Sequence, residues 1–116
     1  MPHRRDSVFI AQMLEAAEAA LEFTDGQTAE SFAGDRLVSF AVVRAVQLIG
    51  QAAHGVSAEL QVAHAEIPWR EIIGMRNVVV HDYADVDLAL VWKTVREDLP
   101  ELIVRLNAIL AASDAS

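Results

Sequence analysis

Apolar residues recur at intervals of three and four along most of the chain, and this periodicity restricts the possible fold more than any other feature. One such series is Ile10, Met13, Ala17 and Leu21. An α-helix places residues at this spacing on one face, whereas a half-buried strand alternates with a period of two. The chain is also poor in the alternating β-branched and aromatic residues that are typical of strands. We therefore predict an all-α fold.

The periodic segments predict four main helices. Their expected ranges are about Asp6 to Phe23, about Asp35 to Ser57, Ile67 through Arg76 towards His81, and from after Asp87 to about Ala112. Asp6 or Ser7 is the expected N-cap of the first helix, Asp87 is the expected N-cap of the last, and a short capped turn over residues 28–32 precedes the second.

Pro100 lies inside the last predicted helix, where proline normally breaks or bends the backbone. The apolar series from Leu88 to Leu110 nevertheless continues on one face across it. We therefore predict one helix kinked at Pro100 rather than two. Residues from about 113 to 116 are expected to fray. Together these elements predict a single helical domain over residues 1–116, folded as an up-and-down bundle.

Composition and charge narrow the functional classes. The chain has 116 residues, 53% of them hydrophobic, which is typical of a packed globular domain rather than a disordered one. It contains no Cys, which excludes disulfides and thiol chemistry and suits a cytoplasmic location. No apolar run approaches the roughly 20 residues of a membrane span, so no membrane association is expected. A net charge of −8 argues against nonspecific coating of nucleic acid, and DNA is not an expected partner. An RNA substrate needs only a local cationic cluster.

A row of polar residues follows one side of the second predicted helix. Its members are Arg44, Gln47, Gln51 and His54, at steps of three, four and three. Such a row can be the solvated face of an amphipathic helix. However, it contains neither Glu nor Lys, the usual residues of such a face in an acidic protein. A lining that faces a cleft or a dimer partner is the alternative, and the sequence leaves both open.

Arg76, Asn77, His81 and Tyr83 form the most informative polar group of the chain. On a regular helix they fall within an arc of about 160°, with Arg76 and His81 about 140° apart. Arg offers a permanent cation and a planar donor fork that matches phosphate oxygens, and His can exchange a proton near neutral pH. The histidines lack the spacing of a zinc site, so no metal and no cofactor are expected. The group therefore suits metal-independent cleavage of RNA, although a structural hydrogen-bond network at a helix end would use the same residues.

Several segments together make the chain similar to the HEPN superfamily and, within it, to the HepT-like toxins. The hallmark is Arg, four to six residues and then His, present here as Arg76-Asn-Val-Val-Val-His81 and extended to Tyr83. Further matching segments are Val43-Arg-Ala-Val-Gln-Leu-Ile-Gly-Gln-Ala52, Ile67-Pro-Trp-Arg70 and Gly74-Met-Arg-Asn77. The resemblance covers nearly the whole chain.

The resemblance implies a homodimer whose two motifs face one cleft, and a ribonuclease toxin that needs no metal. It maps Arg76 and His81 onto the catalytic pair and Asn77 onto the polar position beside the Arg, and we expect Arg44 to support phosphate binding. It also implies an MntA-like nucleotidyltransferase antitoxin, which would transfer AMP from ATP to Tyr83.

The sequence departs from the family pattern at two places. Gln47 stands where an acidic residue is frequent, and Asp82 places a carboxylate beside His81. The alternative function is a non-catalytic partner or substrate-binding subunit of a minimal nucleotidyltransferase.

Overall fold

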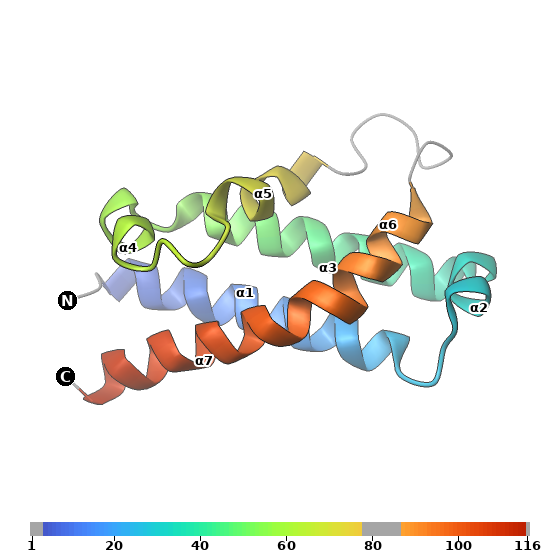
Figure 1. Ribbon diagram of the computed structural model, residues 1–116, viewed down its shortest axis with the longest axis horizontal. Coiled ribbons are helices and arrows are strands. Elements are labelled where there is room, and N and C mark those ends of the chain that lie inside the picture. The colour runs from blue at the N-terminus through green and yellow to red at the C-terminus, as the bar shows by residue number, and fades with distance from the viewer. Residues whose placement is uncertain (1–3, 78–86, 116) are drawn as a thin grey trace.

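The computed structural model describes residues 4–77 and 87–115, and all regular secondary structure within those ranges is helical (Figure 1). This confirms the predicted all-α class. The elements are α1 (Arg4–Thr24), α2 (Ala29–Gly34), α3 (Arg36–Gly55), α4 (Ala58–Ala63), α5 (Trp69–Gly74), the 3-10 turn η1 (Met75–Asn77), α6 (Leu88–Lys93), the π-helical turn η3 (Thr94–Asp98) and α7 (Leu99–Ala115).

Side-chain caps fix where several helices begin. The Asp35 carboxylate accepts a hydrogen bond from the backbone N–H of Val38 at the start of α3, and Asp87 does the same for Leu90 at the start of α6. Thr28 and Ser31 cap α2 reciprocally, each side chain accepting from the backbone N–H of the other. These caps confirm the expected starts of the second and last helices and the capped turn between the first two helices.

The predicted cap of the first helix is wrong, because α1 is already helical at Arg4 and contains both Asp6 and Ser7. Asp6 is only 3% exposed, and its carboxylate accepts hydrogen bonds from the backbone N–H and the hydroxyl of Ser57, at 2.8 and 2.6 Å. Ser57 in turn caps α4, a short helix that the sequence did not predict. Asp6 therefore fastens the start of α1 to the α3–α4 connection instead of capping its own helix.

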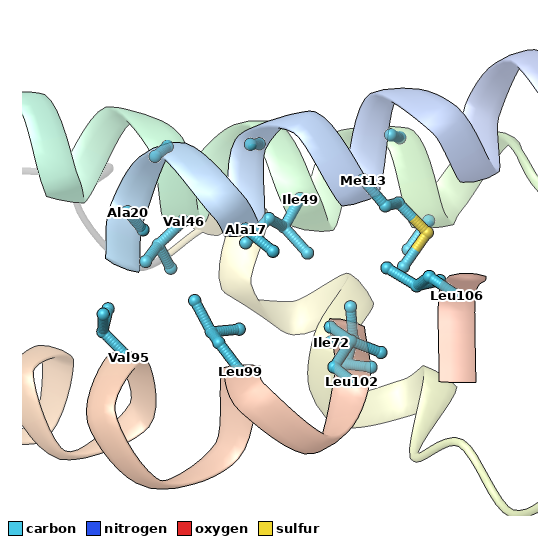
Figure 2. Packing of buried hydrophobic residues seen from close by; sticks show 14 of the residues in the cluster. Met13, Ala17, Ala20, Val46, Ile49, Ile72, Val95, Leu99, Leu102 and Leu106 are labelled. Atoms are coloured by element: carbon cyan, nitrogen blue, oxygen red, sulfur yellow. The ribbon is translucent and has the colours of Figure 1, made fainter. Parts of the chain in front are cut away.

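Helices α1 and α3 make the most extensive contact, α7 packs on α1, and α5 with η1 packs on α3 (Figure 1). One apolar cluster fills the space among them. Figure 2 shows Met13 of α1 against Leu106 of α7, and Ile72 of α5 near Leu102. Helix α3 is long and apolar enough to cross a membrane, with a mean hydropathy of 1.3, but half of that window is buried inside the protein. Packing at the centre of a bundle is sufficient to account for its composition.

The last predicted helix is continuous across Pro100, which confirms the prediction of one kinked helix. Helices α6 and α7 are joined without a break by η3, where the backbone N–H of Leu99 donates to the carbonyl of Thr94, five residues earlier. A proline ring clashes with the carbonyl four residues before it, and this wider turn gives the ring room. Figure 1 shows the resulting bend between α6 and α7. The described helix extends to Ala115, past the expected end at Ala112.

Removing the Leu106 side chain is expected to destabilise the fold strongly. Leu106 is fully buried, and its truncation to alanine leaves a cavity that typically costs about 2–5 kcal/mol of the free energy of unfolding. Val104, two residues earlier on α7, is 68% exposed, so Val104→Ala is the matched control and should change that free energy by less than about 0.5 kcal/mol. Urea unfolding at one fixed protein concentration measures both. Equal destabilisation by the two variants would contradict this assignment of the core.

Candidate active site

The predicted site begins on η1, which carries Arg76 and Asn77. Both side chains are exposed, and η1 continues directly from α5. The predicted partners His81 and Tyr83, together with Asp82, lie outside the described residues, so the geometry that joins Arg76 to His81 is not described. The helix predicted to continue regularly towards His81 instead tightens into a 3-10 turn at Met75–Asn77. The arc calculated for a regular α-helix therefore does not apply at Arg76.

Buried apolar residues and one indole hydrogen bond fix α5 and η1. Ile67, Trp69 and Ile72 are all at least nine-tenths buried. The indole Nε1–H of Trp69 donates to the backbone carbonyl of His64 at 3.0 Å, which ties α5 to the turn before it. Arg76 is thus an exposed cation on a turn whose preceding helix is firmly embedded in the core.

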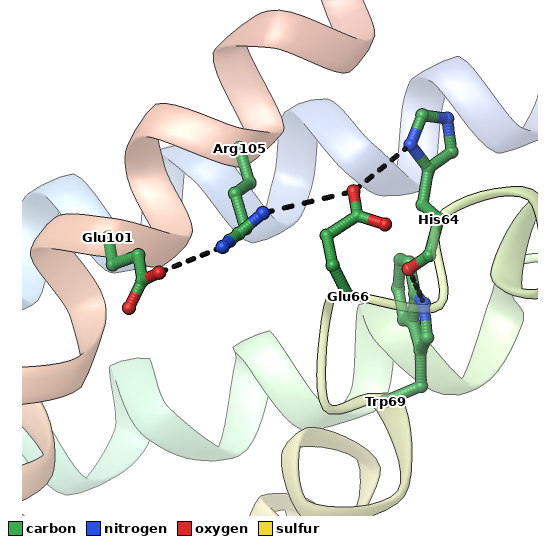
Figure 3. A network of polar contacts seen from close by, with 5 residues as sticks. All are labelled: His64, Glu66, Trp69, Glu101 and Arg105. Atoms are coloured by element: carbon green, nitrogen blue, oxygen red, sulfur yellow. Dashed lines mark hydrogen bonds and ion pairs between the residues drawn. The ribbon is translucent and has the colours of Figure 1, made fainter.

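A polar chain joins the turn before α5 to α7 (Figure 3). Glu66 lies 3.5 Å from Nδ1 of His64 and 3.9 Å from Nη1 of Arg105, and Arg105 also donates to Glu101 at 2.9 Å. A hydrogen bond from its own backbone is the largest cause that lowers the pKa of Glu66; desolvation opposes it, and His64 and Arg105 lower the pKa further. This chain of contacts connects the segment that carries α5 to a second long helix.

The predicted polar row is divided between two surroundings. Arg44 and Gln51 line a groove between α1 and α3, Gln47 is partly buried and accepts a hydrogen bond from Arg44 at 3.4 Å, and His54 is exposed. Gly50, where η1 meets α3, is six residues after Arg44. On a regular helix this places Gly50 about 9 Å further along the axis of α3 and about 120° around that axis from Arg44. The row therefore occupies the strip of α3 between the groove and η1.

The groove has a volume of about 810 Å³ and mainly apolar walls. Phe9, Gln12, Glu15, Ala19 and Phe23 line it from α1, and Ala41, Arg44, Leu48 and Gln51 are among those that line it from α3. Leu48 and Phe23 are apolar residues of these two helices, yet Leu48 is 40% exposed and Phe23 is 43% exposed. The contribution of α1 to the groove was not predicted from the sequence. The sequence signal for the groove was the width of the apolar face on α1 and on α3. Each face is wider than the part that packs against the core.

Within residues 4–77 and 87–115, no cluster of three or more His, Asp or Glu side chains is arranged to hold a metal ion. The chemistry that the described part of the site can supply is the positive charge and the five donors of Arg76, with the amide of Asn77 beside it. Such donors match the oxygens of a phosphate group.

The family model for HepT-like ribonucleases matches residues 13–109, which include α5, η1 and the whole segment from Arg76 to Tyr83. The chain belongs to the HepT-like ribonuclease family. Among relatives of this family, "Probable ribonuclease HepT" of Thermococcus cleftensis is 40% identical over 94 residues, 81% of this chain and 86% of that protein. "Putative RNase MJ1380" of Methanocaldococcus jannaschii is 32% identical over 102 residues, 88% of this chain and 94% of that protein. No solved structure matches the chain significantly.

Membership in this family places the chain among enzymes of the ribonuclease class. The Arg76–Tyr83 segment, which resembles the HepT-like motif, is part of a match that covers most of the chain. The helical bundle agrees with that membership. The exposed Arg76 of this HepT-like protein is the part of the expected catalytic pair that the described residues include.

Proposed function

We propose that this HepT-like protein is a metal-independent endoribonuclease in which Arg76 and His81 act on one scissile phosphate of RNA. The observation that carries the proposal is the exposure of Arg76 on a turn anchored by buried α5 residues, in a chain of this family. The anchored turn fixes the backbone position of Arg76, and its guanidinium can stabilise the charge that develops on phosphate oxygens.

The proposed reaction uses the substrate's own 2′-hydroxyl as the nucleophile. A base removes the proton of the 2′-hydroxyl, its oxygen attacks the adjacent phosphorus, and the bond from phosphorus to the 5′-oxygen of the next nucleotide breaks. A proton is then given to that leaving oxygen. The products are a 2′,3′-cyclic phosphate and a 5′-hydroxyl. His81 is the proposed proton carrier, Arg76 binds the non-bridging oxygens, and Asn77 and Arg44 assist phosphate binding.

The experiment that tests this function is incubation of single-stranded RNA with the purified protein in EDTA. We expect cleavage to continue and mass spectrometry to find 2′,3′-cyclic phosphate ends. Intact RNA, or cleavage abolished by EDTA, would refute metal-independent cleavage. The net charge of −8 is the observation that favours the second candidate, a non-catalytic partner of a nucleotidyltransferase. That candidate predicts that the protein binds the nucleotidyltransferase and leaves the RNA intact.

We further propose that two copies pair through the α1–α3 groove and share one composite cleft. The groove exposes apolar side chains, and it carries Glu15 on one wall and Arg44 on the other. In a two-fold pair the same surface meets itself, so Arg44 of one copy can approach Glu15 of the second copy. The polar row borders this surface, and η1 packs further around α3 on the other side of that row, so the proposed cleft would lie along the border of the paired surfaces rather than inside the groove.

The proposed biological role is that of a cytoplasmic toxin neutralised by an MntA-like nucleotidyltransferase antitoxin that transfers AMP to Tyr83. In that step the Tyr83 hydroxyl oxygen attacks the α-phosphorus of ATP, AMP is bound as a phosphodiester, and pyrophosphate leaves. Incubation with the cognate nucleotidyltransferase and ATP should add one AMP to each chain and abolish RNA cleavage. Mass spectrometry measures the adduct. An adduct that persists in Tyr83→Phe, or no adduct on the wild-type chain, would refute this modification.

A further inference from the structure

Gly50 is the residue of α3 against which the backbone of η1 lies. A Cβ atom built on Gly50 would overlap the backbone N of Arg76, and it would stand 2.8 Å from the carbonyl oxygen of Ile72 and 3.1 Å from the Cα of Arg76. All three neighbours are backbone atoms. They cannot rotate out of the way as the end of a side chain can, so any side chain at position 50 must displace the turn that carries Arg76.

Glycine at this position is not explained by backbone conformation. Gly50 lies in the interior of α3, where glycine costs about 0.5–1 kcal/mol relative to alanine. Two other glycines are different: a Cβ at Gly55 would meet only ring carbons of the Phe9 side chain, and a Cβ at Gly74 would meet nothing within 4 Å. The distinguishing property of Gly50 is therefore its contact with the backbone of Arg76.

We propose that Gly50 is a positioning residue of the active site, which sets how closely η1 approaches α3 and thereby places the Arg76 guanidinium. This inference rests on the proposed function, since it assumes that Arg76 acts on the substrate. Restoring an ordinary contact distance to a methyl group at position 50 requires η1 to move by about 1 Å, and a misplacement of about that size can slow a reaction roughly 100-fold.

Replacing Gly50 with alanine tests the inference, with Gly74→Ala as the matched control. Both variants add one methyl group to a helical glycine, but Gly74 is two residues from Arg76 in the sequence and its added methyl group points into open space. We expect Gly50→Ala to lower kcat on RNA roughly 100-fold with a much smaller change in KM, and Gly74→Ala to retain wild-type kcat. A folded Gly50→Ala variant with wild-type kcat would overturn the inference.

A double-mutant cycle separates positioning from a general structural effect. If Gly50 acts through Arg76, the double variant Gly50→Ala, Arg76→Ala will cleave no more slowly than Arg76→Ala alone. A further loss in the double variant would mean that Gly50 supports something other than Arg76. If Arg76→Ala itself cleaves normally, the proposed function fails, whereas a normal Gly50→Ala beside an inactive Arg76→Ala refutes only the positioning role.

The wild-type protein provides a test that depends on no variant folding. Because a Cβ atom on Gly50 would overlap the backbone N of Arg76, we expect a nuclear Overhauser effect between the Hα protons of Gly50 and the amide proton of Arg76. Observation of that effect supports the contact, and its absence overturns the inference whether or not the protein cleaves RNA.

Discussion

Replacing Arg76 with alanine is expected to slow RNA cleavage by about 100- to 1,000-fold, the usual loss when one preorganised donor to a developing anion is removed. Arg76 lies on the exposed side of η1, so its truncation leaves no cavity and should not lower the free energy of unfolding appreciably. The measurement is the single-turnover rate on a labelled RNA, with far-UV circular dichroism confirming that the variant is folded.

Arg70 supplies the matched control for this experiment. It is an exposed arginine on α5, the helix that leads into η1, so Arg70→Ala removes the same charge from the same region. We expect it to retain cleavage within a few-fold. His81→Ala should lose activity as Arg76→Ala does. Equal cleavage by wild type, Arg76→Ala and His81→Ala would rule out the proposed pair, and equal losses in Arg76→Ala and Arg70→Ala would mean that only net charge matters.

Replacing Leu48 with glutamate is expected to dissociate the proposed homodimer and, with it, the composite cleft. Leu48 lines the α1–α3 groove and is 40% exposed in the single chain, so a charge there is tolerated by the monomer. In a paired groove the same carboxylate must lose its water even with Arg44 one turn away, which costs about 3–5 kcal/mol and raises the dissociation constant by more than about 100-fold. Light scattering at micromolar concentration measures the mass, and the RNA assay should show cleavage lost in parallel.

Val104→Glu is the control for Leu48→Glu, because Val104 is a 68% exposed apolar residue of α7 that does not line the groove. It should leave both mass and cleavage unchanged. A monomeric wild-type protein would contradict the dimer, and a Leu48→Glu variant that stays dimeric would place the interface elsewhere. Full cleavage by a monomeric Leu48→Glu variant would show that one chain contains the complete site.

Local features of the helices were predictable wherever a short stretch of chain determines them. The caps at Asp35 and Asp87 depend on residues three positions apart, and the helix across Pro100 was predictable because its apolar series continues in register. Helix α4 was missed, since six residues are too few to show a period. Asp6 was misassigned because its partner Ser57 lies 51 residues away, and a cap-like residue near a helix start can equally serve a distant segment.

The candidate site shows the same division. The type and spacing of Arg76, Asn77, His81 and Tyr83 pointed to phosphate chemistry, and the family match supports that interpretation at the level of a ribonuclease. The exposure of Leu48 was not predictable, because helical spacing defines an apolar face without showing how much of it the neighbouring helices cover. The same limit left the polar row open between solvent and a cleft.

The sequence by itself determined the helical class, most helix starts, the continuous last helix and the chemical character of the Arg76 segment, because each depends on side chains within a few turns of one another. Only the tertiary structure decided that Asp6 fastens α4, that α1 and α3 leave an apolar groove, and that Gly50 touches the backbone of Arg76. Those features depend on distances between segments that are remote in the chain, and such distances follow from the packing of the whole core.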